Sequence, residues 1–239
     1  MPYDKPLTRT REVIDVIRMA LRREPLKYDG KTVQLPLPEG QGLGLGKPLK
    51  LLTHPERSAV PLFIAALGGK NVELTAEVAD GWIPHLFYPE KAKETWGGQL
   101  AAGAAKRSPD LGPLEVLAGG ACAIGDDVKG VLDFARPMVA LYVGGMGARD
   151  KNFYNQLFCE YGYEKEAKEI QDLYLDGKKE EAAAKVPTEV LEAINLVGPE
   201  GYVKERIAAF KEAGVTNLQI MPVAEDANAL ISKMKELIA

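Results

Sequence analysis

The chain has 239 residues, of which 46% are hydrophobic and 27% charged, and its net charge is −4 at pH 7. This composition is typical of one globular domain with a sizeable core. An acidic chain without a block of Lys or Arg disfavours nucleic acid and anionic membranes as partners, since both need a concentrated positive surface. Cys122 and Cys159 are too far apart for a CxxC pair, and the opening MPYDKPLTRT has no apolar signal region. We therefore expect a reducing, cytoplasmic setting.

The N-terminal part of the sequence predicts a helix, a hairpin and a loop. Apolar residues recur at helical spacing over 7–21, and the segment 26–33 places Asp-Gly between two short extended runs, which is typical of a hairpin. The stretch 35–50, LPLPEGQGLGLGKPLK, is too rich in Gly and Pro for a regular element. It does not match a nucleotide phosphate loop, because five residues separate Gly40 from Gly46-Lys47 and a proline follows.

The rest of the chain alternates between strand and helix patterns. Strands are predicted at 62–66, 81–84, 114–124 and 217–223, and helices at 72–79, 89–107, 128–141, 152–175, 179–194, 199–213 and 227–238. This order indicates parallel β/α units with helices on both faces of the sheet. A complete (β/α)₈ barrel takes about 250 residues and eight strands. With four predicted core strands and a helical insertion at 152–194, the chain is either a smaller open sheet or part of a barrel.

The segment 61–84, PLFIAALGGKNVELTAEVADGWIP, raises the question of an anion site. The pattern predicts strand, turn, helix and strand, with Gly68 and Gly69 at the carboxyl end of the first strand. The small residues Ala65 and Ala66 and the two glycines permit close approach to the backbone, the helix start offers N–H groups, and Lys70 adds a positive charge. From these residues alone, a phosphate site and an ordinary βα turn both remain open.

Two further features suggest a binding site. His54 and His85 are the only histidines and lie in no metal-binding pattern, so we expect no metal site. His85 follows a predicted strand, where barrel enzymes place their chemistry, but without an identified partner the residues favour a partly exposed loop histidine. The segment 141–157, LYVGGMGARDKNFYNQL, combines a Gly-Gly hinge with an arginine, amides and aromatics. It fits either a substrate pocket or a connection between two helices.

Several segments together resemble the luciferase-like monooxygenase superfamily, in particular its branch that uses the deazaflavin coenzyme F420. The similar segments are KPLTRTREVIDVIRMALRRE, KYDGKTVQLP, VPLFIAALGGKNVELTAEVADGWIP and LVGPEGYVKERIAAFKEAGVTNLQIMP. They cover nearly the whole chain, and their order is distinctive. The resemblance implies a TIM-type (β/α)₈ barrel in which the coenzyme lies across the carboxyl ends of the strands.

The resemblance also implies roles for particular residues. The coenzyme-binding candidates, which include a contact to the ribityl phosphate, are Ala65, Ala66, Leu67, Gly68, Gly69, Lys70, Gly81, Trp82 and Ile83. The substrate-pocket candidates are His85, Met146, Arg149 and Tyr154. No residue stands out as a catalytic acid or base.

Family members carry about four βα units ahead of the helix that begins near Thr8 in this chain. We therefore expect residues 1–239 to form a single domain that is the C-terminal half of a barrel, interrupted by the insertion at 152–194. Such a half-barrel has unpaired strand edges, which predicts a homo-oligomer.

The function expected for the family is hydride transfer between F420 and a small organic substrate. An FMN-dependent luciferase-like monooxygenase is the alternative enzyme, since the barrel and the phosphate site are shared. An alternative of another class is a half-barrel that associates with other chains and is not catalytic.

Overall fold

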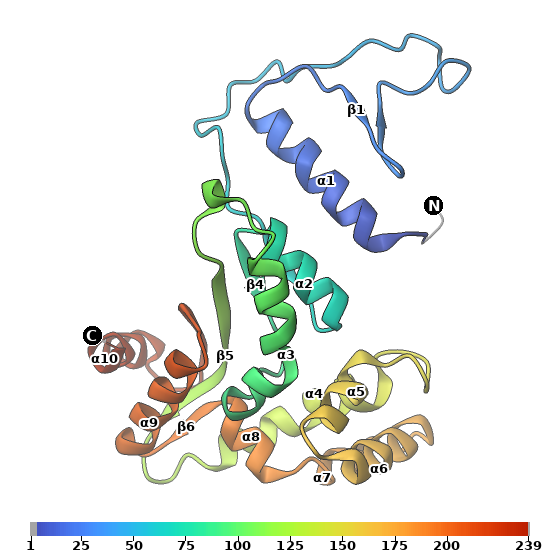
Figure 1. The fold of residues 1–239 in the computed structure, drawn as a ribbon. Helices are drawn as coiled ribbons and strands as arrows, with labels where there is room; N and C mark the ends of the chain where they lie inside the picture. The colour runs from blue at the N-terminus through green and yellow to red at the C-terminus, as the bar shows by residue number, and fades with distance from the viewer. Residues whose placement is uncertain (1–3, 239) are drawn as a thin grey trace.

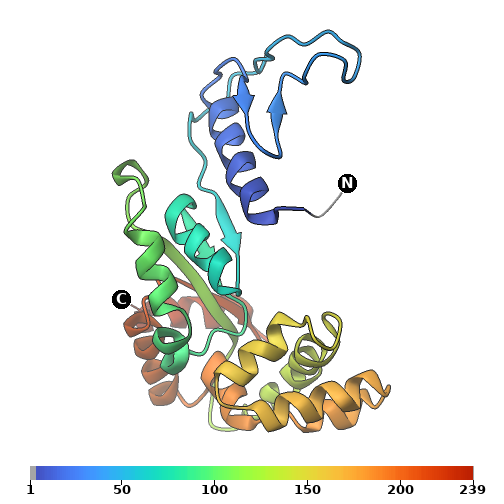
Figure 2. The ribbon, with the colours of Figure 1, turned by 45° about the vertical axis from the view of Figure 1, so that its right-hand side comes forward.

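The structure is a computed structural model that describes residues 4–238 (Figure 1). The described chain begins with α1 (Pro6–Leu21), followed by an antiparallel hairpin of β1 (Tyr28–Asp29) and β2 (Gln34–Leu35). A long connection without helix or strand then leads into the main sheet. Figures 1 and 2 both show α1 and the hairpin at one end of the molecule. The helix and the hairpin are confirmed as predicted.

The main sheet is parallel and is built around one long strand. Its strands are β3 (Phe63–Ala65), β4 (Gly81–Ile83), β5 (Glu115–Ile124), β6 (Leu196–Gly198) and β7 (Asn217–Pro222). β3 pairs with β4, β4 pairs with the start of β5, and β7 runs along the middle of β5. Cys122 is in register with residues of both β6 and β7, so these strands lie on opposite edges of β5. The predicted α/β fold with a parallel sheet is confirmed.

The helices along the sheet form a single layer. α2 (Gly69–Val78) packs on α3 (Pro89–Ala104), α3 contacts α9 (Glu200–Glu212), and α9 contacts α10 (Ala227–Ile238). Gln219 and Met221 of β7 remain exposed. The prediction of helices on both faces is therefore wrong, since these β7 side chains are not covered by a helix layer. A single outer layer of helices is the arrangement found around a barrel. Among residues 4–238, no helix is both long enough and apolar enough to cross a membrane.

A second group of helices lies beyond the carboxyl end of β5 (Figure 1). It is built around α4 (Gly130–Gly145). The helices that contact α4 are α5 (Phe153–Glu160), α6 (Glu164–Leu175), α7 (Lys179–Ala184) and α8 (Thr188–Ile194). Two of the three helices predicted over this stretch, 152–175 and 179–194, are each divided into two. Gly162 has φ +91° and ends α5, while Pro187 stands immediately before α8.

Glu12 of α1 binds the hairpin turn through hydrogen bonds. Its carboxylate is 5% exposed and accepts hydrogen bonds from the N–H groups of Lys31, Thr32 and Val33 and from the Thr32 hydroxyl. The bond from the hydroxyl and those from the backbone lower the pKa of Glu12 to about 2. The hairpin turn is therefore ordered by one buried carboxylate.

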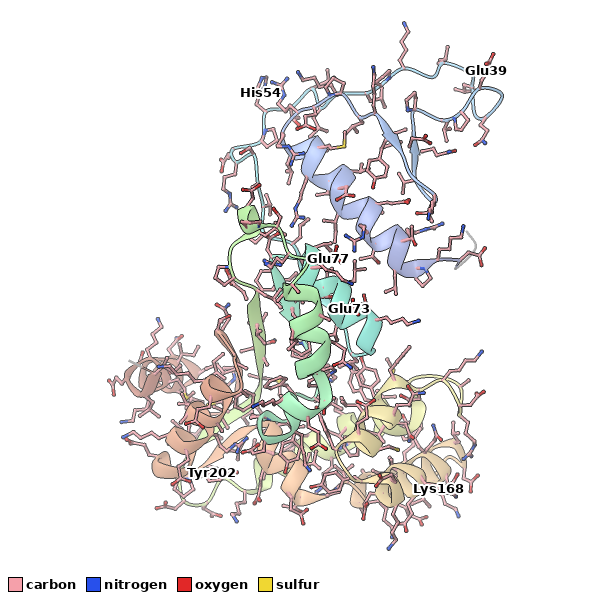
Figure 3. All side chains as sticks on the ribbon, viewed as in Figure 1. Glu39, His54, Glu73, Glu77, Lys168 and Tyr202 are labelled. Atoms are coloured by element: carbon pink, nitrogen blue, oxygen red, sulfur yellow. The ribbon has the colours of Figure 1, made fainter. Side chains whose placement is uncertain are left out.

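We expect Glu12→Gln to destabilise the fold at pH 7, because an amide cannot accept all four bonds. The folded-state pKa lies below the unfolded value of 4.5, so the carboxylate stabilises the fold above that pH and loses its effect as the pH falls toward 2. The difference in thermal midpoint between the two proteins should shrink between pH 5 and pH 2. Glu39→Gln, at an exposed position of the loop (Figure 3), is the control. A constant difference across this range would contradict the assignment.

Candidate functional site

A cavity of about 580 Å³ lies where β3 and β4 end and α2 begins. Its walls come from the start of α1, the turn from β3 into α2, the residues after β4, and the start of α5. The lining residues are Pro6, Leu7, Thr10, Ala65, Ala66, Leu67, Gly68, Gly69, Lys70, Asn71, Ile83, His85, Phe153 and Tyr154. The carboxyl end of parallel strands is where α/β proteins bind ligands.

Ion pairs hold α1 in place as a wall of the cavity. Arg11 forms a bidentate ion pair with Glu77 of α2, with N–O distances of 2.8 and 2.6 Å. The Nη2 atom of Arg18 lies 3.1 Å from Oδ2 of Asp80. Figure 3 labels Glu77 on α2, near α1. The hydrogen bond to Arg11 lowers the pKa of Glu77, so the pair stays charged at neutral pH. The position of α1 is thus set from helix α2, which also forms the floor of the cavity.

The turn from β3 into α2 presents backbone donors. Gly68 is the N-cap of α2, with φ −65° and ψ 135°, and its carbonyl accepts from the N–H groups of Asn71 and Val72. Within residues 4–238, the N–H groups of Leu67, Gly68, Gly69 and Lys70 make no hydrogen bond. Four successive free N–H groups at a helix start can bind an anion, and the helix dipole adds to the attraction.

Two tryptophans hold this turn from inside the protein. The indole N–H of Trp82 donates to the Ala66 carbonyl at 2.9 Å, and that of Trp96 donates to the Leu67 carbonyl at 3.0 Å. Each tryptophan is 1% exposed, and their rings meet edge to face at 5.2 Å. The backbone at the carboxyl end of β3 is therefore fixed by the core.

His85 stands on the other side of the cavity within an aromatic cluster. Its ring centroid lies 4.3 Å from that of Tyr142 and 5.7 Å from that of Tyr154. Burial lowers the pKa of His85, which favours the neutral imidazole at pH 7. Burial, together with the neighbouring Tyr142, raises the pKa of Tyr154, so its phenol stays protonated. This wall is aromatic and uncharged at neutral pH.

Two buried polar atoms of the lining residues have no partner in the part of the chain that the structure describes. They are Oδ1 of Asn71 and Nε2 of His85. Buried polar atoms are nearly always hydrogen-bonded, so unpaired ones beside a cavity mark a place where a ligand or water interacts.

The structure brings most of the predicted site residues together. Those that line the cavity are Ala65, Ala66, Leu67, Gly68, Gly69, Lys70, Ile83, His85 and Tyr154. The predicted order of strand, turn, helix and strand over 61–84 is confirmed, with Gly68 and Gly69 just beyond the end of β3.

Four predicted residues do not line the cavity. A Cβ at Gly81 would lie 2.1 Å from the Phe63 ring, so this glycine permits close packing, and Trp82 is buried beneath the turn. Arg149 forms an ion pair with Asp172 of α6. Met146, which follows α4, is 46% exposed. Arg149 thus contacts α6 and does not line the cavity.

Four lining residues, namely Pro6, Leu7, Thr10 and Asn71, were not predicted, and Phe153 was indicated only as one of the aromatics of the segment 141–157. The first three come from α1, about 60 residues away from the turn they face. No local pattern predicts such a contact. Asn71 could have been found, because a polar residue in the first turn of a helix that follows a glycine pair lies beside the free N–H groups.

Comparisons with known proteins identify relatives of this chain. The profile of the luciferase-like monooxygenase family matches residues 1–217. A protein of Mycobacterium tuberculosis described as a candidate coenzyme F420-dependent oxidoreductase is 37% identical over 222 residues, which make up 91% of this chain and 63% of the relative. The 5,10-methylenetetrahydromethanopterin reductase of Archaeoglobus fulgidus is 27% identical over 99% of this chain and 67% of its own length.

Solved structures share the fold. The coenzyme F420-dependent tetrahydromethanopterin reductase of Methanopyrus kandleri superposes with a TM-score of 0.71 at 23% identity, over 98% of this chain and 61% of that one. An F420-dependent secondary alcohol dehydrogenase gives 0.66 at 18% identity, over 100% of this chain and 64% of that one. The chain therefore spans somewhat less than two thirds of the length of these proteins. With a family profile that matches most of the sequence, the chain belongs to the luciferase-like monooxygenase family.

Proposed function

We propose that this chain binds the phosphate-bearing end of coenzyme F420 and forms part of an oxidoreductase that transfers hydride between F420 and a small organic substrate. The observation that carries the proposal is the row of four free N–H groups from Leu67 to Lys70 beside the cavity. The names of the relatives from Mycobacterium tuberculosis and Methanopyrus kandleri both include coenzyme F420, which supports the choice of coenzyme.

The residues of the turn fit a phosphate. Free N–H groups and the helix dipole attract an anion, and Lys70 is the one charged side chain among the described residues that line the cavity. Gly68 has no side chain that would cover the donors. Its Cβ position would lie 3.2 Å from the Phe153 ring, so this ring closes over the place a side chain would take. When bound, F420 would supply the hydride chemistry.

The opposite wall suits an uncharged organic substrate. His85 and Tyr154 keep their neutral forms at pH 7, and Ile83 beside them is apolar. A carbonyl or hydroxyl group can exchange a hydrogen bond with a neutral imidazole or phenol without the cost of burying a charge. We assign His85 and Tyr154 to substrate orientation and to the exclusion of water.

Ligand-observed NMR titration tests the proposal, because it measures weak as well as tight binding. The chain is titrated with F420 and with the phosphate-free deazariboflavin that carries the same ring. We expect the Kd of F420 to be at least about tenfold lower, since charge-assisted hydrogen bonds contribute roughly 1.5–3 kcal/mol each. Equal values of Kd for the two ligands would refute the phosphate assignment.

The same titration with FMN and riboflavin separates the alternatives. Preference for FMN over F420 would favour the flavin monooxygenase. No binding of any of the four ligands would favour a chain that associates with others without holding a coenzyme.

A further inference from the structure

We infer that Trp82 and Trp96 are positioning residues that aim the N–H groups of Leu67 and Gly68 at a phosphate in the cavity. The inference rests on the proposed function, because the phosphate is that of the coenzyme. It concerns two side chains that do not line the cavity and that would act only through the backbone they hold.

The first step is the direction of the peptide groups. The Ala66 carbonyl shares a peptide unit with the Leu67 N–H, and the Leu67 carbonyl shares one with the Gly68 N–H. In a planar trans peptide, the C=O and N–H bonds point in opposite directions. The two indoles bind these carbonyls from the core side. Both N–H groups must therefore point away from the tryptophans, toward the cavity that Leu67 and Gly68 line.

The second step is rigidity. Trp82 extends from β4 and contacts Phe87 edge to face, while Trp96 extends from α3 and stacks on Phe87 with an angle of 4° between the rings. Both indoles are 1% exposed, so neither can rotate without displacing the core. Donors held in advance bind an anion more tightly than donors that must first be ordered.

The third step is that two consecutive peptide units are held by donors from two different elements. β4 supplies the donor for Ala66 and α3 supplies the donor for Leu67. A single bond would leave the next peptide free to turn, and a reversed peptide would present a carbonyl oxygen to the phosphate. The pair of bonds excludes that arrangement.

The sequence allows a direct test, because Trp82 and Trp96 are its only tryptophans. Growth of a tryptophan auxotroph on benzothienylalanine replaces both indoles by a ring of nearly the same shape in which sulfur takes the place of the N–H. The core keeps its volume, and only the two donors are lost. We expect the preference of the chain for F420 over the phosphate-free deazariboflavin to fall by at least about tenfold.

The readout is the Kd of the phosphate-free deazariboflavin divided by the Kd of F420, and a merely structural role would not change this ratio. If the tryptophans only support the fold, the substituted protein loses affinity for both ligands alike and the ratio stays constant, which overturns the inference. If the unmodified protein shows no preference for F420, the proposed function fails first, and this inference falls with it. The two failures are therefore distinguishable.

Single variants separate the two donors. Trp82→Phe and Trp96→Phe should each lower the ratio, whereas Phe158→Leu should lower thermal stability and leave the ratio unchanged. Phe158 is a fully buried core residue of α5 that does not line the cavity. A fall of the same size in Phe158→Leu would show that general loosening causes the effect, and would overturn the inference.

Discussion

Replacing Gly68 by valine is expected to raise the Kd of F420 at least about tenfold, which corresponds to roughly 1.4 kcal/mol. The backbone at Gly68, with φ −65° and ψ 135°, is extended and suits a β-branched residue, so the fold should tolerate the change. The new Cβ would lie 3.2 Å from the Phe153 ring, and the two methyl groups would spread beside the free N–H groups. An anion could then no longer reach all four donors. Fluorescence titration of the deazaflavin measures the effect.

The specificity of this change can be controlled in two ways. The Kd of the phosphate-free deazariboflavin should change much less, because this ligand does not use the donors. Gly98→Val, in the middle of α3 where a Cβ meets no neighbour within 4 Å, is the matched substitution and should leave both values of Kd unchanged. Unchanged F420 affinity in Gly68→Val would refute the role of the turn in phosphate binding.

The turn at 65–70 could be predicted from the sequence because its signals are local. An apolar run that ends in small residues and a Gly-Gly pair, followed by a helical pattern, indicates a strand, a tight turn and a helix start. The structure has these elements in this order. The hydrogen bond from Trp82 to the turn could not be predicted, since the sequence does not reveal that the indole N–H donates to a carbonyl 16 residues earlier.

The rest of the site depends on contacts distant in sequence. The segment 141–157 was predicted to be either part of a substrate pocket or a connection between helices. Phe153 and Tyr154 line the cavity, whereas Arg149 forms an ion pair with Asp172 of α6, a contact that no local pattern predicts. The three residues of β6 were missed because such a short strand leaves no period to detect. Self-association stays a prediction. It rests on the outer edges of β3 and β7, which pair with no other strand in the described part of the chain.

Gly119→Ala is expected to be among the most destabilising single substitutions in the sheet. Gly119 lies in the middle of β5 with φ +149°, a conformation that residues with a side chain rarely adopt. A Cβ there would lie 1.9 Å from the carbonyl oxygen of Gln219 in β7. The strands cannot both keep their register and accept the methyl group, so β7 must move away from β5. We expect a loss of about 3 kcal/mol or more in the free energy of unfolding.

The measurement is urea unfolding followed by circular dichroism, with Gly98→Ala as the control of opposite sign. Gly98 lies inside α3 with no atom within 4 Å of a Cβ, so alanine there should stabilise the protein by about 0.5–1 kcal/mol through helix propensity. An unchanged midpoint in Gly119→Ala would mean that β5 and β7 are not held as closely as the register requires. Since β5 is the strand that joins β4, at the edge of the cavity, to β7, the variant should also lose affinity for both deazaflavins alike. That uniform loss differs from the selective loss expected for Gly68→Val, and so separates damage to the scaffold from damage to the phosphate site.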